Sequence, residues 1–194
     1  MREERADAAR NRRAILAATE GLLAAHGPQD ISMEQVAAAA GVAKGTVFHR
    51  FGNRTGLMNA LMAERAAALN EAVISGPPPL GPGAPDGERL TAFLDAIVEV
   101  VGRNKSLLAE LGRSIAPAPD MTPDNHPVYA LWHGHIATLL SSVNPGADAE
   151  MIAHLMLGSL HSTPILAQLA EEGPDRLARA LRLLAVACEK GEPA

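Results

Sequence analysis

The chain has 194 residues, 47% of them hydrophobic, and a formal net charge of -5, which suits one or two domains with a sizeable core. Its one cysteine, Cys188, excludes an internal disulfide, and no apolar run approaches the roughly 18 residues of a membrane span. The charged start MREERADAAR is unlike a signal peptide, so we expect a cytoplasmic protein. Abundant Ala, Leu, Glu and Arg with few β-branched runs predict an all-α fold.

Charge is divided unevenly along the sequence. Residues 1–56 hold eight Lys/Arg against six Asp/Glu, a net +2, and the remainder holds nine against sixteen, a net -7. This asymmetry favours an anionic partner for the N-terminal part rather than for the rest of the chain.

A first helix is predicted from about Ala6 to Ala25. Apolar residues from Ile15 to Leu23 recur at helical spacing, while Arg10, Arg12 and Arg13 lie off that stripe. We interpret these arginines as a solvated face from which a side chain can reach a flanking phosphate.

Two short helices are predicted between Ile31 and Arg54. Ser32 with Gln35 three residues later is typical of a capping box, and Ile31 with Val36 fits a hydrophobic staple. Gly41 can take the left-handed conformation that ends a helix, so the chain can turn sharply into a second helix from Lys44 to about Phe51. Two short helices joined by a tight glycine turn predict a helix-turn-helix.

The second helix divides by its 3.6-residue period into a buried and an exposed face. Val47 and Phe51 should point to the core, which leaves the other residues for base edges and phosphates. Asn53 can cap a third helix that begins at Arg54, where amides and a guanidinium can anchor a phosphate. The residues predicted to meet DNA are Ser32, Lys44, Gly45, Thr46, Phe48, His49 and Arg54.

The pattern S-M-x-x-V-A-x-x-A-G-V-x-x-G-T-V-F-x-x-F-x-x-R-x-x-L after an N-terminal helix resembles the DNA-binding domain of tetracycline-repressor (TetR) family regulators, from about Arg10 to Leu61. The resemblance implies a homodimeric transcriptional regulator, usually a repressor, whose C-terminal helices bind a small effector and which is not an enzyme. It implies a DNA-binding domain over residues 1–54 and an effector-binding and dimerisation domain over 55–194. No cofactor is expected.

Two positions depart from the pattern of that family. Ala43 stands where the family commonly has a capping Ser or Thr, and Phe48 stands where it commonly has a phosphate-binding Tyr. The lost cap costs about 0.5–2 kcal/mol, and the lost hydroxyl removes one hydrogen bond to a phosphate. Both changes lower the expected affinity for DNA and leave the function unchanged.

After Arg54 a long helix is predicted to run to Ser75, followed by the Pro- and Gly-rich loop SGPPPLGPGAPDG. Five helices should follow, marked by apolar stripes at 90–101, 107–111, 129–140, about 148–170 and 174–188, with Pro164 bending the fourth. The Pro- and Asp-rich segment PAPDMTPDNHP should form a loop before the third of them.

The last two of these helices are the dimer face that the resemblance implies. Leu177, Leu181, Leu184 and Cys188 supply an apolar stripe, and Gly158, Ser159 and Ser162 would allow close approach of the partner.

The predicted C-terminal domain over residues 55–194, which includes this dimer face, should also hold a small apolar or weakly polar effector. Soft methionines, aromatic rings and scattered polar groups are typical of such a pocket, although an ordinary filled core fits them nearly as well. The residues predicted for the pocket are Phe93, Tyr129, Trp132, Met151, His154, Met156 and His161, with Met121 nearby.

Five of the seven histidines lie in the second lobe, at 126, 133, 135, 154 and 161, which raises the alternative of a helical metal-binding protein or enzyme. No H-E-x-x-H motif is present, no cysteine lies near these histidines, and His133 and His135 should point to different sides of one helix. No P-loop, Rossmann or G-x-S-x-G motif is present either, so the sequence favours the regulator, with no metal site.

Overall fold

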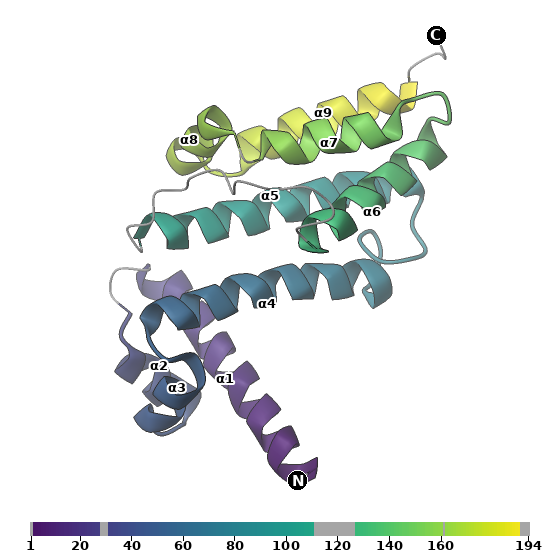
Figure 1. The fold of residues 1–194 in the computed structure, drawn as a ribbon. Helices are drawn as coiled ribbons and strands as arrows, with labels where there is room; N and C mark the ends of the chain where they lie inside the picture. The colour runs from purple at the N-terminus through teal and green to yellow at the C-terminus, as the bar shows by residue number, and fades with distance from the viewer. Residues whose placement is uncertain (1, 28–30, 111–126, 161, 191–194) are drawn as a thin grey trace. The chain divides into compact units, whose positions relative to one another are not determined.

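The computed structural model describes residues 2–27, 31–110, 127–160 and 162–190. Across these residues it contains nine α-helices and no strand, which confirms the all-α prediction. They form two compact units, with the first division inside a helix, between Arg65 and Ala66. The units are described separately below (Figure 1).

The first unit contains α1 (Arg2–His26), α2 (Met33–Ala40), α3 (Lys44–Phe51) and the first half of α4 (Arg54–Ser75). The predicted second, third and fourth helices match α2, α3 and α4 closely. One apolar cluster holds the unit together, with its most buried members Ile15, Val36, Val47, Leu57 and Met58 drawn from all four helices. Leu107, near the end of α5, also belongs to this cluster.

Ion pairs between α1 and α4 support this packing. The Arg65 guanidinium, only 11% exposed, donates to both carboxylate oxygens of Glu20 at 3.0–3.1 Å. Arg12 donates to Glu64 at 2.7 Å. Bidentate geometry and partial burial make the first pair the stronger of the two.

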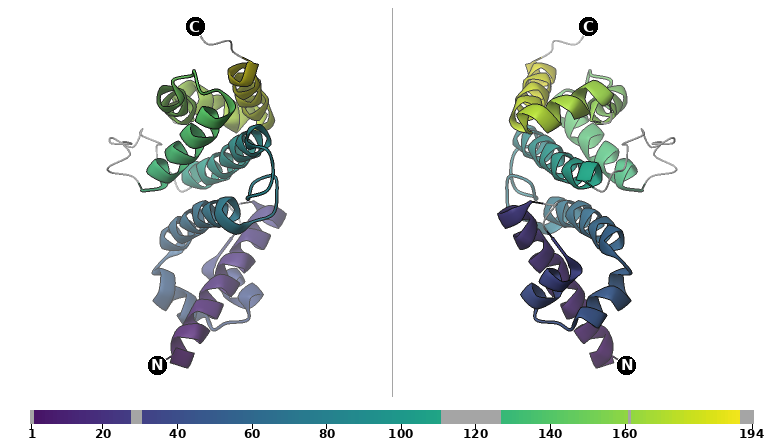
Figure 2. Two further views of the ribbon diagram at one scale, coloured as in Figure 1. Left: turned by 90° about the vertical axis from the view of Figure 1, so that its right-hand side faces the viewer. Right: turned by 90° about the vertical axis from the view of Figure 1, so that its left-hand side faces the viewer.

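The second unit contains the rest of α4, most of α5 (Asp86–Glu110), α6 (Pro127–Val143), α7 (Ala149–Ser159), α8 (Thr163–Glu172) and α9 (Asp175–Lys190). Helix α6 lies against α7 and α9. Figure 2 shows the ribbon from two further sides. The core contains Phe93, Ile97, Ile136, Leu140 and Leu157, each at most 2% exposed. It is built from aliphatic and aromatic side chains of every helix in the unit.

The second unit divides into helices differently from the prediction. The stripes at 90–101 and 107–111 belong to one helix, α5, as far as residue 110. The predicted bent helix over 148–170 is instead two helices, α7 and α8, with Pro164 in the first turn of α8. Because proline lacks the N–H that a helix interior needs, it starts a new helix after the extended Ser162 rather than bending an old one.

The apolar stripe predicted for the dimer face is also divided. Leu181, 3% exposed, belongs to the unit's own core, and Leu177 packs against that core, whereas Leu184 is 55% exposed. Residues 117–126 of the predicted loop PAPDMTPDNHP, which include Met121 and His126, lie outside the described residues, and the last residue of that loop, Pro127, begins α6. His161 and the side chain of Cys188 also lie outside the described residues.

Candidate nucleic-acid interface

Helix α2 begins with the predicted capping box. The Ser32 amide donates to Gln35 Oε1 at 2.7 Å, and the Gln35 amide donates to Ser32 Oγ at 3.2 Å. Ile31 and Val36 are both buried, as a hydrophobic staple requires. The exposed Ser32 hydroxyl accepts in the box and also hydrogen-bonds the Glu34 carboxylate.

The turn between α2 and α3 is built on Gly41, whose φ of 67° and ψ of 29° lie in the left-handed region. The Gly41 amide donates to the Ala38 carbonyl at 3.2 Å and the Val42 amide donates to the Ala37 carbonyl at 3.0 Å. This pair of bonds is a Schellman motif, which satisfies carbonyls at the end of α2 and fixes the direction of α3.

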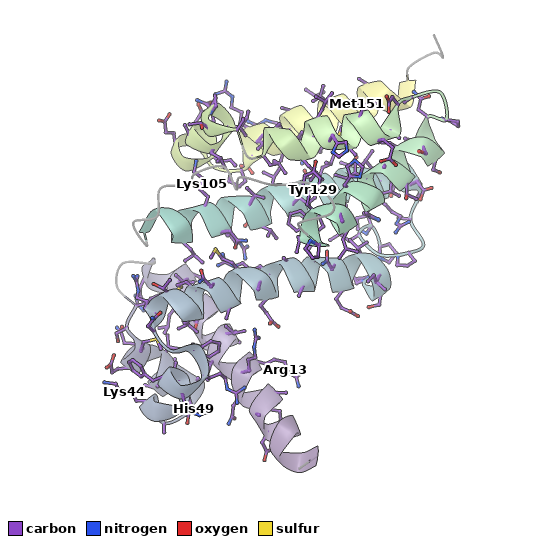
Figure 3. The ribbon with its side chains drawn as sticks, viewed as in Figure 1. Arg13, Lys44, His49, Lys105, Tyr129 and Met151 are labelled. Carbon is purple, nitrogen blue, oxygen red and sulfur yellow. The ribbon has the colours of Figure 1, made fainter. Side chains whose placement is uncertain are left out.

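Helix α3 has the predicted facing. Val47 is fully buried and Phe51 packs against the core, while Gly45 and His49 are exposed and Thr46 is half-buried. Phe48 is 38% exposed, so it does not belong to the core. Figure 3 shows the Lys44 and His49 side chains at the outer surface of the unit.

Lys44 has two neighbours that the sequence analysis did not predict. Its ammonium forms an ion pair with Glu34 of α2 and lies 5.5 Å from the centroid of the Phe48 ring. The hydrogen bond from Lys44 lowers the pKa of the Glu34 carboxyl. Glu34 comes from another helix, so no spacing within α3 could have indicated this pair.

The start of α4, where the sequence predicts a phosphate anchor, is capped by Asn53 as predicted. Asn53 Oδ1 accepts a hydrogen bond from the Gly56 amide at 2.9 Å, and Arg54 is half-buried in the first turn. A Cβ atom at Gly56 would lie 2.0 Å from the Phe51 carbonyl oxygen, so only glycine fits there. The sequence analysis missed this role; a glycine three residues after a capping Asn was its only signal.

The α1 arginines are mostly engaged with carboxylates. Arg10 pairs with Asp7 and Arg12 with Glu64, while Arg13 is exposed at the surface (Figure 3). Of these three residues, Arg13 is therefore the one best placed to reach a flanking phosphate.

A comparison with known protein families supports the helix-turn-helix assignment. Residues 15–61 match the family model "Bacterial regulatory proteins, tetR family". This stretch spans the helix-turn-helix and the start of α4. This chain carries the helix-turn-helix DNA-binding domain of TetR-like regulators.

Solved structures share the fold along nearly the whole chain. A TetR-family transcriptional regulator from Pectobacterium atrosepticum superposes with a TM-score of 0.61 at 21% identity, covering 98% of this chain and 99% of that one. A transcriptional regulator from Rhodococcus sp. Rha1 gives 0.60 at 19% identity, covering 94% and 98%. FadR from Bacillus subtilis, in complex with stearoyl-CoA, gives 0.56 at 14% identity, covering 93% and 98%. A search of curated protein sequences found no match.

In the second unit, Tyr129 and His154, both predicted for the effector pocket, come together with His133 between α6 and α7. Tyr129 Oη and His154 Nδ1 are 2.7 Å apart, and the His133 and His154 ring centroids are 3.9 Å apart. His133 Nε2 lies 3.1 Å from the Glu150 carbonyl oxygen, and burial raises the pKa of the Tyr129 phenol. Among the described residues no group of three or more His, Cys, Asp or Glu could hold a metal ion.

The other residues predicted for the effector pocket are dispersed. Phe93 and Met156 are buried in the core, whereas Met151 is 54% exposed on α7 (Figure 3). Trp132 Nε1 donates to Asn70 Oδ1 at 2.9 Å. A surface hollow of about 420 Å³, lined mainly by α5 with Pro79 and Val186, contains none of these residues.

His135, on the same helix as His133, contacts a different neighbour. Its ring meets Phe93 edge to face at a centroid distance of 4.6 Å. Burial lowers the pKa of His135, and the nearby Arg89 charge adds to this effect while Asp86 opposes it.

None of the described helices combines the length and apolar character needed to cross a membrane.

Proposed function

We propose that this regulator is a repressor that binds a palindromic operator as a homodimer and leaves it when a small apolar or weakly polar molecule binds. The observation that carries the proposal is the solvent-facing N-terminal side of α3, held between a Schellman turn and a capped α4. A recognition helix reads base edges from that side.

Each residue of this face has a chemical part in the proposal. Lys44 and Thr46 contact base edges or phosphates, with the Thr46 methyl suited to a thymine methyl group. Gly45 lets the backbone approach the duplex, since no side chain stands in the way. Ser32, His49 and Arg54 hold the phosphate backbone, and Phe48 packs against it.

In the proposed homodimer, the interface is formed by the outer face of α9 together with the preceding helix, α8. Ala180, Leu183, Leu184 and Ala187 are exposed and recur at i, i+3, i+4 and i+7, with Leu183 71% exposed. An exposed apolar helix stripe of this kind is typical of a packing surface. A two-fold dimer places its recognition helices on half-sites one helical turn, about 34–36 Å, apart or a multiple of it.

The effector of the proposal enters the second unit. The polar groups of Tyr129, His133 and His154 lie inside an otherwise apolar helix layer, where they can fix a few polar atoms of a ligand. Because the FadR structure holds stearoyl-CoA, a long-chain acyl compound is a reasonable first ligand to test.

Selection of duplexes from a randomised library at low salt tests the operator. We expect recovery of an inverted repeat. The Arg54→Ala variant should then bind every duplex more weakly and lower the salt slope by about one unit, because one phosphate contact is lost. Arg103→Ala on α5 is the matched control, since it removes the same charge from the second unit and should change neither quantity.

Thermal unfolding of Arg54→Ala separates lost binding from lost folding. If the folded variant keeps wild-type affinity and salt slope, the phosphate anchor is wrongly assigned. If no duplex binds better than a random one, the operator proposal is wrong.

A further inference from the structure

Lys44, the first residue of the recognition helix, is held from two sides in the free protein. Its ammonium pairs with Glu34 from the first turn of α2, and it lies 5.5 Å from the Phe48 ring centroid, within the range of a cation–π contact. The side chains of Lys44 and Glu34 are 58% and 54% exposed, so water and salt can compete with the pair.

We propose that Glu34 is a positioning residue that directs Lys44 toward a base edge and keeps it from reaching arbitrary phosphates. This proposal rests on the operator binding proposed above. A lysine ammonium has three donors, so Lys44 can keep its bond to Glu34 and still donate to a guanine O6 or N7. A phosphate that lies beyond the reach of the paired ammonium can be contacted only if the long Lys44 side chain leaves Glu34.

This geometry separates operator from generic DNA in two ways. On the operator the pair is retained, and it restricts the lysine rotamers before the base contact forms. On generic DNA the pair competes with a phosphate contact, and Glu34 adds a negative charge close to the polyanion. Both effects weaken generic binding more than operator binding.

Glu34→Gln removes the charge while keeping nearly the same shape, and because the side chain is exposed the fold should be unaffected. For a scrambled duplex we expect tighter binding, up to about fivefold at low salt, and a salt slope steeper by about one unit. For the duplex selected by the wild-type protein, affinity should stay equal or fall. The ratio of the two affinities should therefore decrease.

Two comparisons identify the cause. In a Lys44→Met background the effect of Glu34→Gln on the scrambled duplex should disappear. Glu99→Gln, which removes a somewhat less exposed ion pair with Arg103 on α5, should leave both duplexes unaffected. Without DNA, NMR titration should find the Glu34 pKa lowered in the wild-type protein and closer to its ordinary range in Lys44→Met.

Equal tightening of both duplexes by Glu34→Gln would overturn the proposal, because Glu34 would then act as a uniform repulsive charge. So would an undiminished effect in the Lys44→Met background, or no effect at all. Selection of a sequence by the wild-type protein is scored separately, so failure of the operator proposal is distinguishable from failure of this one.

Discussion

Two glycines in the DNA-binding unit serve opposite purposes. Nothing lies within 4 Å of a Cβ built at Gly45, whereas a Cβ at Gly56 would lie 2.0 Å from the Phe51 carbonyl oxygen. Gly45→Ala should raise the free energy of unfolding by up to about 1 kcal/mol, because alanine favours the helix, yet weaken DNA binding by holding the backbone away.

Gly56→Ala should instead lower the free energy of unfolding by about 1–3 kcal/mol, since the backbone must move to admit the methyl group. Denaturant unfolding and duplex titration of both variants measure the contrast. A Gly56→Ala protein as stable as the wild type would show that the turn between α3 and α4 adjusts freely.

His135 makes stability depend on pH. Burial lowers its pKa in the folded state, so between that pKa and the unfolded value of about 6.5 the unfolded chain binds more protons. The free energy of unfolding should therefore fall as the pH drops below about 6.5, and the effect should be complete below the folded-state pKa. Urea unfolding at several pH values should show a smaller decline for His135→Gln than for the wild type. Equal declines would mean that other groups carry the pH dependence.

At the scale of the helix, α3 lacks a side-chain cap. Ala43 is extended, with φ -65° and ψ 142°, and makes no side-chain hydrogen bond to the first turn. A serine there can accept a hydrogen bond from a free amide of that turn, so Ala43→Ser should stabilise the unit by about 0.5–2 kcal/mol. Denaturant unfolding measures the gain, and Ala43→Val, which cannot accept a hydrogen bond, is the control. If both variants are equally stable, the end of α3 is already satisfied by other means.

The helix-turn-helix could be predicted almost to the residue because its signals are local. Ser32, Gln35 and Gly41 each act within one turn of their own position, and the helix period separates buried Val47 from exposed Phe48. The second unit was harder, because tertiary packing decides where its helices are divided. Gly102 does not interrupt α5, whereas α7 ends at Ser159 and Pro164 lies in the first turn of the next helix, α8.

Contacts between helices could not be predicted at all. Glu34 meets Lys44 from the preceding helix, and Asn70 meets Trp132 from a helix far away in sequence. No periodicity within one helix indicates such partners. Leu181 and Leu184 illustrate the same limit, because both look apolar on the α9 stripe while only Leu184 faces outward.

For the whole molecule, the contrast between exposed Leu184 and buried Leu181 gives a direct test of the proposed dimer. Leu184→Glu replaces an exposed side chain on the proposed interface and should yield a folded monomer. Leu181→Glu buries a charge in the core and should unfold the second unit instead. Light scattering together with circular dichroism distinguishes the two outcomes. A wild-type protein that is monomeric at micromolar concentration would contradict the dimer.

The proposed effector response requires communication along the chain. Helix α4 contributes Arg54 to the first unit and Asn70 to the second, and Asn70 accepts the hydrogen bond of the Trp132 indole. A ligand that favours one arrangement of α4 changes DNA affinity by no more than its differential affinity for the two states.

Trp132 is the one tryptophan of the sequence, so its emission reports this hydrogen bond. A long-chain fatty acid, which keeps the apolar part of the ligand in the FadR structure, is the first probe. It should shift the emission, raise the thermal midpoint by preferential binding to the folded state, and weaken duplex binding in parallel. Asn70→Ala should shift the emission without ligand, because the indole N–H loses its acceptor. Trp132→Phe should abolish the signal and retain the thermal shift. A compound that releases DNA while leaving both Trp132 emission and the thermal midpoint unchanged would place the effector site away from α6 and α4.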